Sequence, residues 1–291
     1  SSRFTRSLLR GSLLGGLARE HRMTVPELIA ALALPASCRV DQRVPKKMLI
    51  ENGAPTAADK RLLNDAIEEI QWVAALKPNT VGVPNYRDDD REYLEVVVLS
   101  IAMRGAHATV DGDGSAPTPN TIAKPVNTTR LAELVHRAVP YPLLLLLATP
   151  QGLFLSMAHK RWAQNEAGKV VLDGEVTTLE AVGDLSPAHP FMQGLALKRQ
   201  PQATLMALYQ GWLDCLTALQ VVRYTGTFKA IDDPAQAAAR RAALRECQRL
   251  EQEAARLRVQ AGKEKQMAKQ VELNLAMQRL LAQAQATREK L

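Results

Sequence analysis

The last sixty residues constrain the fold of this chain more than any other segment. From Asp233 to Leu291, proline occurs only at position 234 and glycine only at position 262, and most other residues are strong helix formers. Asp233 followed by Pro234 is typical of a helix start, because the carboxylate can cap free backbone N–H groups and proline fits the first helical position. We therefore predict one helix over 233–291, about 85 Å long at 1.5 Å per residue.

Small and apolar side chains recur along this tail three and four residues apart, which is typical of a helix that packs against another helix. The pattern continues beyond a polar break at Glu264. A helix much longer than a single domain requires should bind a partner. We predict a coiled-coil-like tail that drives homo- or hetero-oligomerisation through Leu250, Leu257, Val271 and Leu275.

The net charge of +7 is concentrated at the two ends of the chain. Residues 1–22 carry five arginines and one acid, and residues 232–291 carry twelve basic and eight acidic residues. Residues 23–231 are therefore nearly neutral. This distribution argues against a domain that binds polyanions over its whole surface.

Three widely spaced cysteines form no CxxC pair, which favours a reducing compartment and argues against a zinc module. No apolar run reaches the eighteen residues that a membrane span needs. We therefore expect a cytoplasmic protein that does not bind membranes. The basic segment 1–22 is either a basic arm or targeting piece, or a non-native extension ahead of a natural start at Met23.

Residues 23–190 carry the signals of an α+β domain with a four- to five-stranded mixed sheet and flanking helices. Capping boxes at Thr24 and Thr56 predict two helix starts, and Gly105 to Asn127 has a loop composition. Helices are predicted over 24–34, 56–77 and 131–138, and an amphipathic helix over 200–220. Strands are predicted over 93–103, 143–148, 153–158, 169–172 and 176–179.

No catalytic, metal or cofactor site can be assembled from the sequence. The chain contains no phosphate-binding P-loop, no GxGxxG, no GxSxG and no HExxH, and its five histidines lack ligand spacing. A nuclease of the PD-(D/E)xK kind needs an acid and a lysine two residues apart, and no such pair occurs. A divergent metal-dependent nuclease using Glu92, Glu95 and a distant lysine remains the alternative function.

Several basic clusters are candidates for contact with nucleic acid or a partner. The alternative is ordinary solvated charge, with the tryptophan of one cluster packed on the sheet. The candidate contact residues are Arg43, Lys46, Lys47, Lys60, Arg61, Lys77, Lys160, Arg161, Trp162, Arg256, Arg258, Lys263 and Lys265.

Five short sequences occur in order along the domain: RVPKK at 43–47, ADKR at 58–61, IEEIQW at 67–72, LKPNT at 76–80 and PYP at 140–142. In order and spacing, they resemble a bacterial family catalogued as domain of unknown function 4391, and the resemblance covers about residues 23–219. It implies no activity or site residues. Members are often encoded beside helicase-like and DNA-methyltransferase proteins, which implies a place in restriction-like phage defence.

We therefore expect a non-catalytic scaffold subunit of an anti-phage defence complex. The α+β domain would bind a helicase or DNA-methyltransferase subunit, the tail would drive assembly, and basic tail residues would contact DNA. A plain DNA-binding module is a third hypothesis, and its phosphate contacts would appear as a linear dependence of log affinity on log salt.

Overall fold

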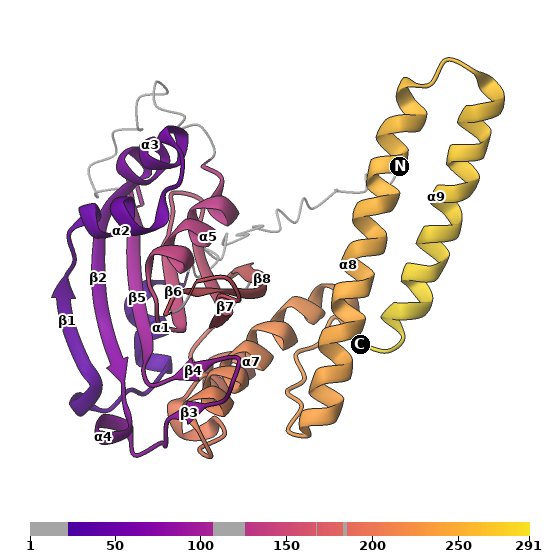
Figure 1. The fold of residues 1–291 in the computed structure, drawn as a ribbon. Helices are drawn as coiled ribbons and strands as arrows, with labels where there is room; N and C mark the ends of the chain where they lie inside the picture. The colour runs from indigo at the N-terminus through magenta and orange to yellow at the C-terminus, as the bar shows by residue number, and fades with distance from the viewer. Residues whose placement is uncertain (1–22, 107–125, 167, 183–184) are drawn as a thin grey trace, which may run out of the picture.

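The computed structural model describes residues 23–106, 126–166, 168–182 and 185–291 (Figure 1). The predicted extension over 1–22 and most of the predicted loop from Gly105 to Asn127 lie outside the described residues. A six-stranded mixed sheet forms the centre of the domain, in the order β1-β2-β5-β6-β7-β8. Only β5 and β6 are parallel. The strands are β1 (Arg39–Arg43), β2 (Ile67–Leu76), β5 (Val96–Met103), β6 (Leu143–Ala148), β7 (Leu153–Trp162) and β8 (Val170–Glu180).

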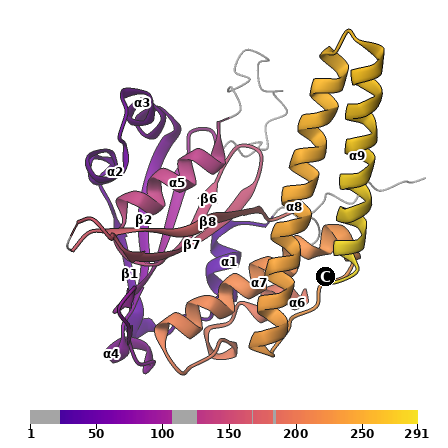
Figure 2. The same ribbon diagram turned by 45° about the vertical axis from the view of Figure 1, so that its right-hand side comes forward.

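Helices cover both faces of this sheet, so the domain has three layers that can be followed in Figure 2. One face is covered by α2 (Lys46–Gly53), α3 (Ala57–Ala66) and α5 (Thr128–Ala138). The other is covered by α1 (Val25–Ala31), α6 (Pro190–Gly194) and α7 (Leu205–Thr225). Short elements complete the fold: α4 (Pro78–Val81) and the two-stranded sheet of β3 (Tyr86–Arg87) and β4 (Glu92–Tyr93).

The central strands show why the sheet is buried on both sides. In β5, Val96 and Val98 pack in the cluster under α7, whereas Val97 and Leu99 pack under α5. The leucines of β6 alternate in the same way. Strands that are apolar on both faces are typical of a sheet enclosed between two helical layers. The predicted α+β class and mixed sheet are confirmed.

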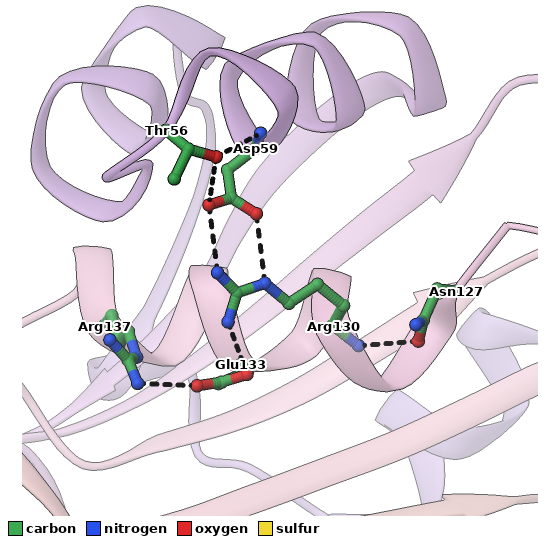
Figure 3. Close-up of polar contacts among 6 residues, drawn as sticks. All are labelled: Thr56, Asp59, Asn127, Arg130, Glu133 and Arg137. Atoms are coloured by element: carbon green, nitrogen blue, oxygen red, sulfur yellow. Dashed lines mark hydrogen bonds and ion pairs between the residues drawn. The ribbon is translucent and has the colours of Figure 1, made fainter.

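Ion pairing joins the helices of one layer, as Figure 3 shows. Arg130 of α5 donates to both carboxylate oxygens of Asp59 on α3, at 3.0 and 2.9 Å. Thr56, the predicted cap of α3, accepts from the backbone N–H of Asp59 and donates to its carboxylate. These contacts hold the pKa of Asp59 below its usual range, chiefly through the hydrogen bonds from Arg130.

The predicted helix over 56–77 is wrong beyond Ala66, because residues 67–76 form strand β2. The pairing of β2 with β5 contains two register shifts. Each β-bulge adds a residue, so the usual two-residue alternation is interrupted. Ile67 and Ile70 therefore lie on one face of the sheet across the first shift, and Val73 is buried on the other face. Burial on both faces gives a spacing of three that imitates a helix.

The last sixty residues are helical as predicted, but a single continuous helix is wrong. Helix α8 (Pro234–Lys263) and helix α9 (Met267–Arg288) form an antiparallel hairpin beside the domain (Figure 1). The chain turns at Glu264, whose carboxylate accepts hydrogen bonds from the next two backbone N–H groups at 2.9 and 3.0 Å. The polar break in the tail sequence is therefore the hairpin turn.

Helix α7 joins the hairpin to the domain. Within the described part of the chain it is the one helix long and apolar enough to cross a membrane by composition. Its large side chains are instead buried in the protein core, including Leu208, Trp212 and Leu216. On its other side, Asp214 accepts a hydrogen bond from Arg241 of α8. The predicted amphipathic helix over 200–220 is thus the support of the tail.

Candidate functional site

Exposed apolar side chains gather on the C-terminal hairpin. Of nine large hydrophobic residues exposed in the described part of the chain, five lie on α8 or α9. Met267 is 74% exposed and Val259 57% exposed. The remaining three are Val271, Leu275 and Leu281. Such clustering is typical of an interaction surface rather than of scattered surface apolar residues.

One exposed strip of α9 carries no charged side chain from Met267 to Gln285. At 100° per residue, nine exposed residues lie within an arc of about 140°. They follow three heptad positions, and we call them the outer face of α9: Met267, Asn274 and Leu281; Val271, Gln278 and Gln285; Ala268, Leu275 and Ala282. In a chain with 23% charged residues, an exposed strip of this length without charge favours a protein-binding role.

The four predicted oligomerisation residues do not share one surface. Leu250 is 2% exposed and packs inside the hairpin, and Leu257 is half-buried. Val271 and Leu275 lie on the outer face of α9. Part of the apolar repeat therefore stabilises the hairpin itself, and the other part is available to a partner.

The basic residues predicted to contact nucleic acid along the tail surround the hairpin turn. Arg258, Lys263 and Lys265 are exposed, and none of them has an ion-pair partner among the described residues. Arg256 lies 3.7 Å from the carboxylate of Glu253. The end of the hairpin therefore presents unneutralised positive charge.

On the domain, most predicted contact residues have protein partners. Arg43 pairs with Glu69 at 3.7 Å, and Lys47 pairs with Glu51 at 3.5 Å. The Nζ of Lys46 donates to the carbonyl oxygen of a β2 residue, and desolvation lowers the pKa of Lys46. Of these predicted contact residues, only Lys60 and Arg61 on α3 are exposed and have no ion pair among the described residues.

The prediction that Lys160 contacts a phosphate or partner from the surface is wrong, because this residue is 3% exposed. Its Nζ donates to the carbonyl oxygens of His136, at 2.7 Å, and of Val139. A cation at this end of α5 satisfies carbonyls that lack helical partners. Burial lowers the pKa of Lys160 to about 7. Lys160 is therefore a structural cap.

Arg161 and Trp162 follow Lys160 at the end of β7. The Arg161 guanidinium lies 3.7 Å from the carboxylate of Asp173, and Trp162 is half-buried. Both residues line a cavity of about 120 Å³ with Tyr141 of the PYP sequence. This small apolar hollow and the exposed Tyr141 form a second, minor feature of the surface.

The acids proposed for a divergent nuclease are paired with cations. Glu95 lies 3.2 Å from the Nζ of Lys77, and Glu92 lies 3.6 Å from the guanidinium of Arg87. Across the described residues, no group of three His, Cys, Asp or Glu side chains is arranged to hold a metal ion. The structure thus brings one acid and one lysine together without the second acid that such a site requires.

The described residues include a nucleophile–base pair, but it is enclosed. The Nε2 of His136 lies 3.0 Å from the Oγ of Ser156, and both residues are 0% exposed. Burial lowers the pKa of His136 to about 3, so the ring is neutral near pH 7. A pair without access to substrate fits a structural role.

A polar chain that the sequence did not predict runs from the sheet to the hairpin. Tyr93 donates to Nδ1 of His159, whose Nε2 donates to Gln210 at 2.9 Å. Gln210 donates to Asp214 at 3.0 Å, which also accepts from Arg241. These residues come from four elements, so no local spacing reveals them. They fix the hairpin against α7, beside a groove of about 720 Å³.

Comparison with known protein families gives a match that covers both the domain and the hairpin. The family described as Domain of unknown function (DUF4391) matches residues 32–283, which include both the sheet and most of the hairpin. No curated protein and no solved structure matches the chain. The C-terminal hairpin is therefore part of the family pattern, and the chain belongs to the family of Domain of unknown function (DUF4391) proteins.

Proposed function

We propose that the protein is a non-catalytic scaffold subunit of a multi-protein anti-phage defence complex. A helicase or DNA methyltransferase is the proposed partner, because members of the resembled family are often encoded beside such proteins. The outer face of α9 is the single observation that carries the assembly role. It is exposed, uncharged and runs from Met267 to Gln285, about 27 Å along the helix.

The polar groups of the domain support a structural role for that part of the chain. Lys160 caps a helix, His136 and Ser156 are enclosed, and Glu95 pairs with Lys77. Each group has a protein partner that accounts for its position. This pattern favours a domain whose surface binds a partner over a domain that performs chemistry.

The basic end of the hairpin supports contact with a DNA backbone. Arg258, Lys263 and Lys265 lie close together in sequence around the turn, and none of them forms an ion pair among the described residues. Such contacts would position the complex on DNA without reading its sequence. We place the complex in the cytoplasm, where DNA is accessible and free thiols such as Cys38 stay reduced.

Purification of a tagged chain expressed from its native operon tests this function. The proposal predicts that a helicase or DNA methyltransferase copurifies with the chain at a fixed ratio. A chain that copurifies with neither would contradict it. The same preparation separates the nuclease alternative: Mg²⁺-dependent cleavage of plasmid DNA that Glu95→Ala abolishes would replace the scaffold proposal.

A further inference from the structure

We propose that the outer face of α9 binds the same face of α9 in a second copy of this chain, with the two helices antiparallel. This inference rests on the proposed assembly role of the hairpin and names the partner of that surface. The helix supplies both the apolar contacts and the charges that such a pair needs.

Several apolar and amide side chains on the outer face form pairs that are centred on residue 276. An axis close to residues 275 and 276 brings Val271 of one copy opposite Leu281 of the other. The same axis brings Asn274 opposite Gln278, so that the two amides can form hydrogen bonds. Leu275 of each copy then lies near the centre, offset along the helix by about 3 Å from its own counterpart. The outer face is therefore complementary to itself.

The charges beside the outer face obey the same symmetry. Glu272 and Arg279 are exposed, lie seven residues apart on one flank, and have no ion-pair partner among the described residues. The axis close to residues 275 and 276 places Glu272 of each copy opposite Arg279 of the other. Two equivalent ion pairs would then border the contact.

The relative orientation of the two α9 helices follows from the flank that carries Glu272 and Arg279. In an antiparallel pair, a perpendicular twofold axis brings equal flanks of the two helices together. In a parallel pair the axis joins opposite flanks, and Glu272 would then not meet Arg279. Charge pairs beside an apolar seam commonly determine the orientation of paired helices. The position of Glu272 and Arg279 therefore selects the antiparallel arrangement.

Charge exchange in the full-length chain tests the inference by sedimentation velocity over a concentration range up to about 100 µM, where a small helix–helix contact would be populated. The wild-type chain should form a reversible dimer. Glu272→Arg and Arg279→Glu should each weaken it on the order of ten-fold, because two ion pairs become two repulsive contacts. The double variant Glu272→Arg/Arg279→Glu should restore wild-type affinity within about three-fold.

Two valine variants provide a matched test of the apolar contact. Val271→Glu on the outer face should yield a folded monomer, with unchanged helical circular dichroism. Val259→Glu should leave the dimer intact, because Val259 is equally exposed but lies on α8. A wild-type monomer at all concentrations, or single charge variants that the double variant does not rescue, would overturn the inference. A chain that stays monomeric but still copurifies with the helicase or methyltransferase would overturn the dimer inference and leave the proposed function intact. A dimer that does not copurify with either partner would count against the proposed function and leave the dimer inference intact.

Discussion

Glu251 of α8 and Arg288 of α9 form an ion pair with an Oε1–Nη2 distance of 2.7 Å, although 37 residues separate them in sequence. The ring of Tyr224 on α7 completes this joint: its hydroxyl donates to Glu251 at 2.9 Å, and the Arg288 guanidinium lies 5.2 Å from its centroid. One cluster thus connects α7 with both helices of the hairpin. The end of α9 is therefore folded back against α8 and α7.

A disulfide cross-link tests directly whether α9 lies along α8. The Sγ of Cys247 lies 3.7 Å from the carbonyl oxygen of Ala284. Ala284→Cys should therefore form an intramolecular disulfide with Cys247 under mild oxidation, identified by peptide mapping. Ala282→Cys, on the exposed side of α9, is the control and should not form it. In a straight helix the two positions would lie about 55 Å apart, so equal absence of the link in both variants would contradict the hairpin.

Two glycine substitutions should change stability in opposite directions. A Cβ at Gly53 would lie 2.5 Å from the carbonyl oxygen of Leu134 and 2.7 Å from the Cβ of Ala138. Gly53→Ala should therefore force α2 away from α5 and cost about 1–3 kcal/mol in urea unfolding. Gly262→Ala meets no atom within 4 Å and should stabilise the end of α8 by about 0.5–1 kcal/mol. Equal effects would show that α2 and α5 are not in close contact.

The pair of Asp59 and Arg130 should make stability depend on pH at the acidic end. The pKa of Asp59 is lowered in the folded chain, so its contribution is complete above the ordinary aspartate value of about 4 and disappears as pH falls through the lowered value. Asp59→Asn should reduce the melting temperature by several degrees at pH 7, and the difference from wild type should shrink toward pH 2. Asp65→Asn, an exposed change on the same helix, should alter neither the melting temperature at pH 7 nor its dependence on pH. A difference that stays constant with pH would refute this assignment.

Lys160 should also make stability rise with pH, but in a neutral to alkaline window. Its pKa is lowered by burial to about 7, whereas the unfolded chain holds that proton up to about pH 10.4. Between these values the unfolded state binds more protons, so wild-type stability rises with pH relative to Lys160→Met. Urea unfolding at several values from pH 6.5 to 10 would detect the rise. Lys169→Met, at an exposed lysine, is the control, and parallel curves for Lys160→Met and wild type would contradict a buried amine.

DNA binding should depend on charge at the turn of the hairpin. Lys265→Glu should weaken binding to duplexes of any sequence, and should reduce the slope of log affinity against log salt by about 1. Lys290→Glu makes the same change of charge at the opposite end of the hairpin and should have little effect. An equal loss for the two variants would indicate binding to net charge rather than to the turn.

The local signals in the sequence predicted much of this fold. Thr24, Thr56 and Asp233 cap helices in the structure, as their positions before acidic or proline-containing turns indicated. The β6–β7 hairpin was also predicted, because a Pro-Gln-Gly turn separates two apolar runs. Where neighbouring residues determine a helix start or a turn, the sequence was sufficient to predict it.

Features that depend on distant residues were not predictable in this way. A register shift against β5 and burial on both faces of the sheet gave β2 a helical spacing. The burial of Lys160 depends on α5 packing over β7. Helix propensity could not distinguish one long helix from a hairpin, because the turn at Glu264 contains neither proline nor glycine. The apolar repeat indicated that the tail packs against another helix. It did not indicate that two halves of the tail, α8 and α9, pack against each other.

The molar mass of the complex with its helicase or methyltransferase neighbour, measured by light scattering on the coexpressed proteins, tests the central claim most directly. A scaffold assembled through the outer face of α9 predicts one species that contains two copies of this chain together with that partner. A chain that elutes alone at the mass of one copy, in the presence of both neighbours, would contradict the account.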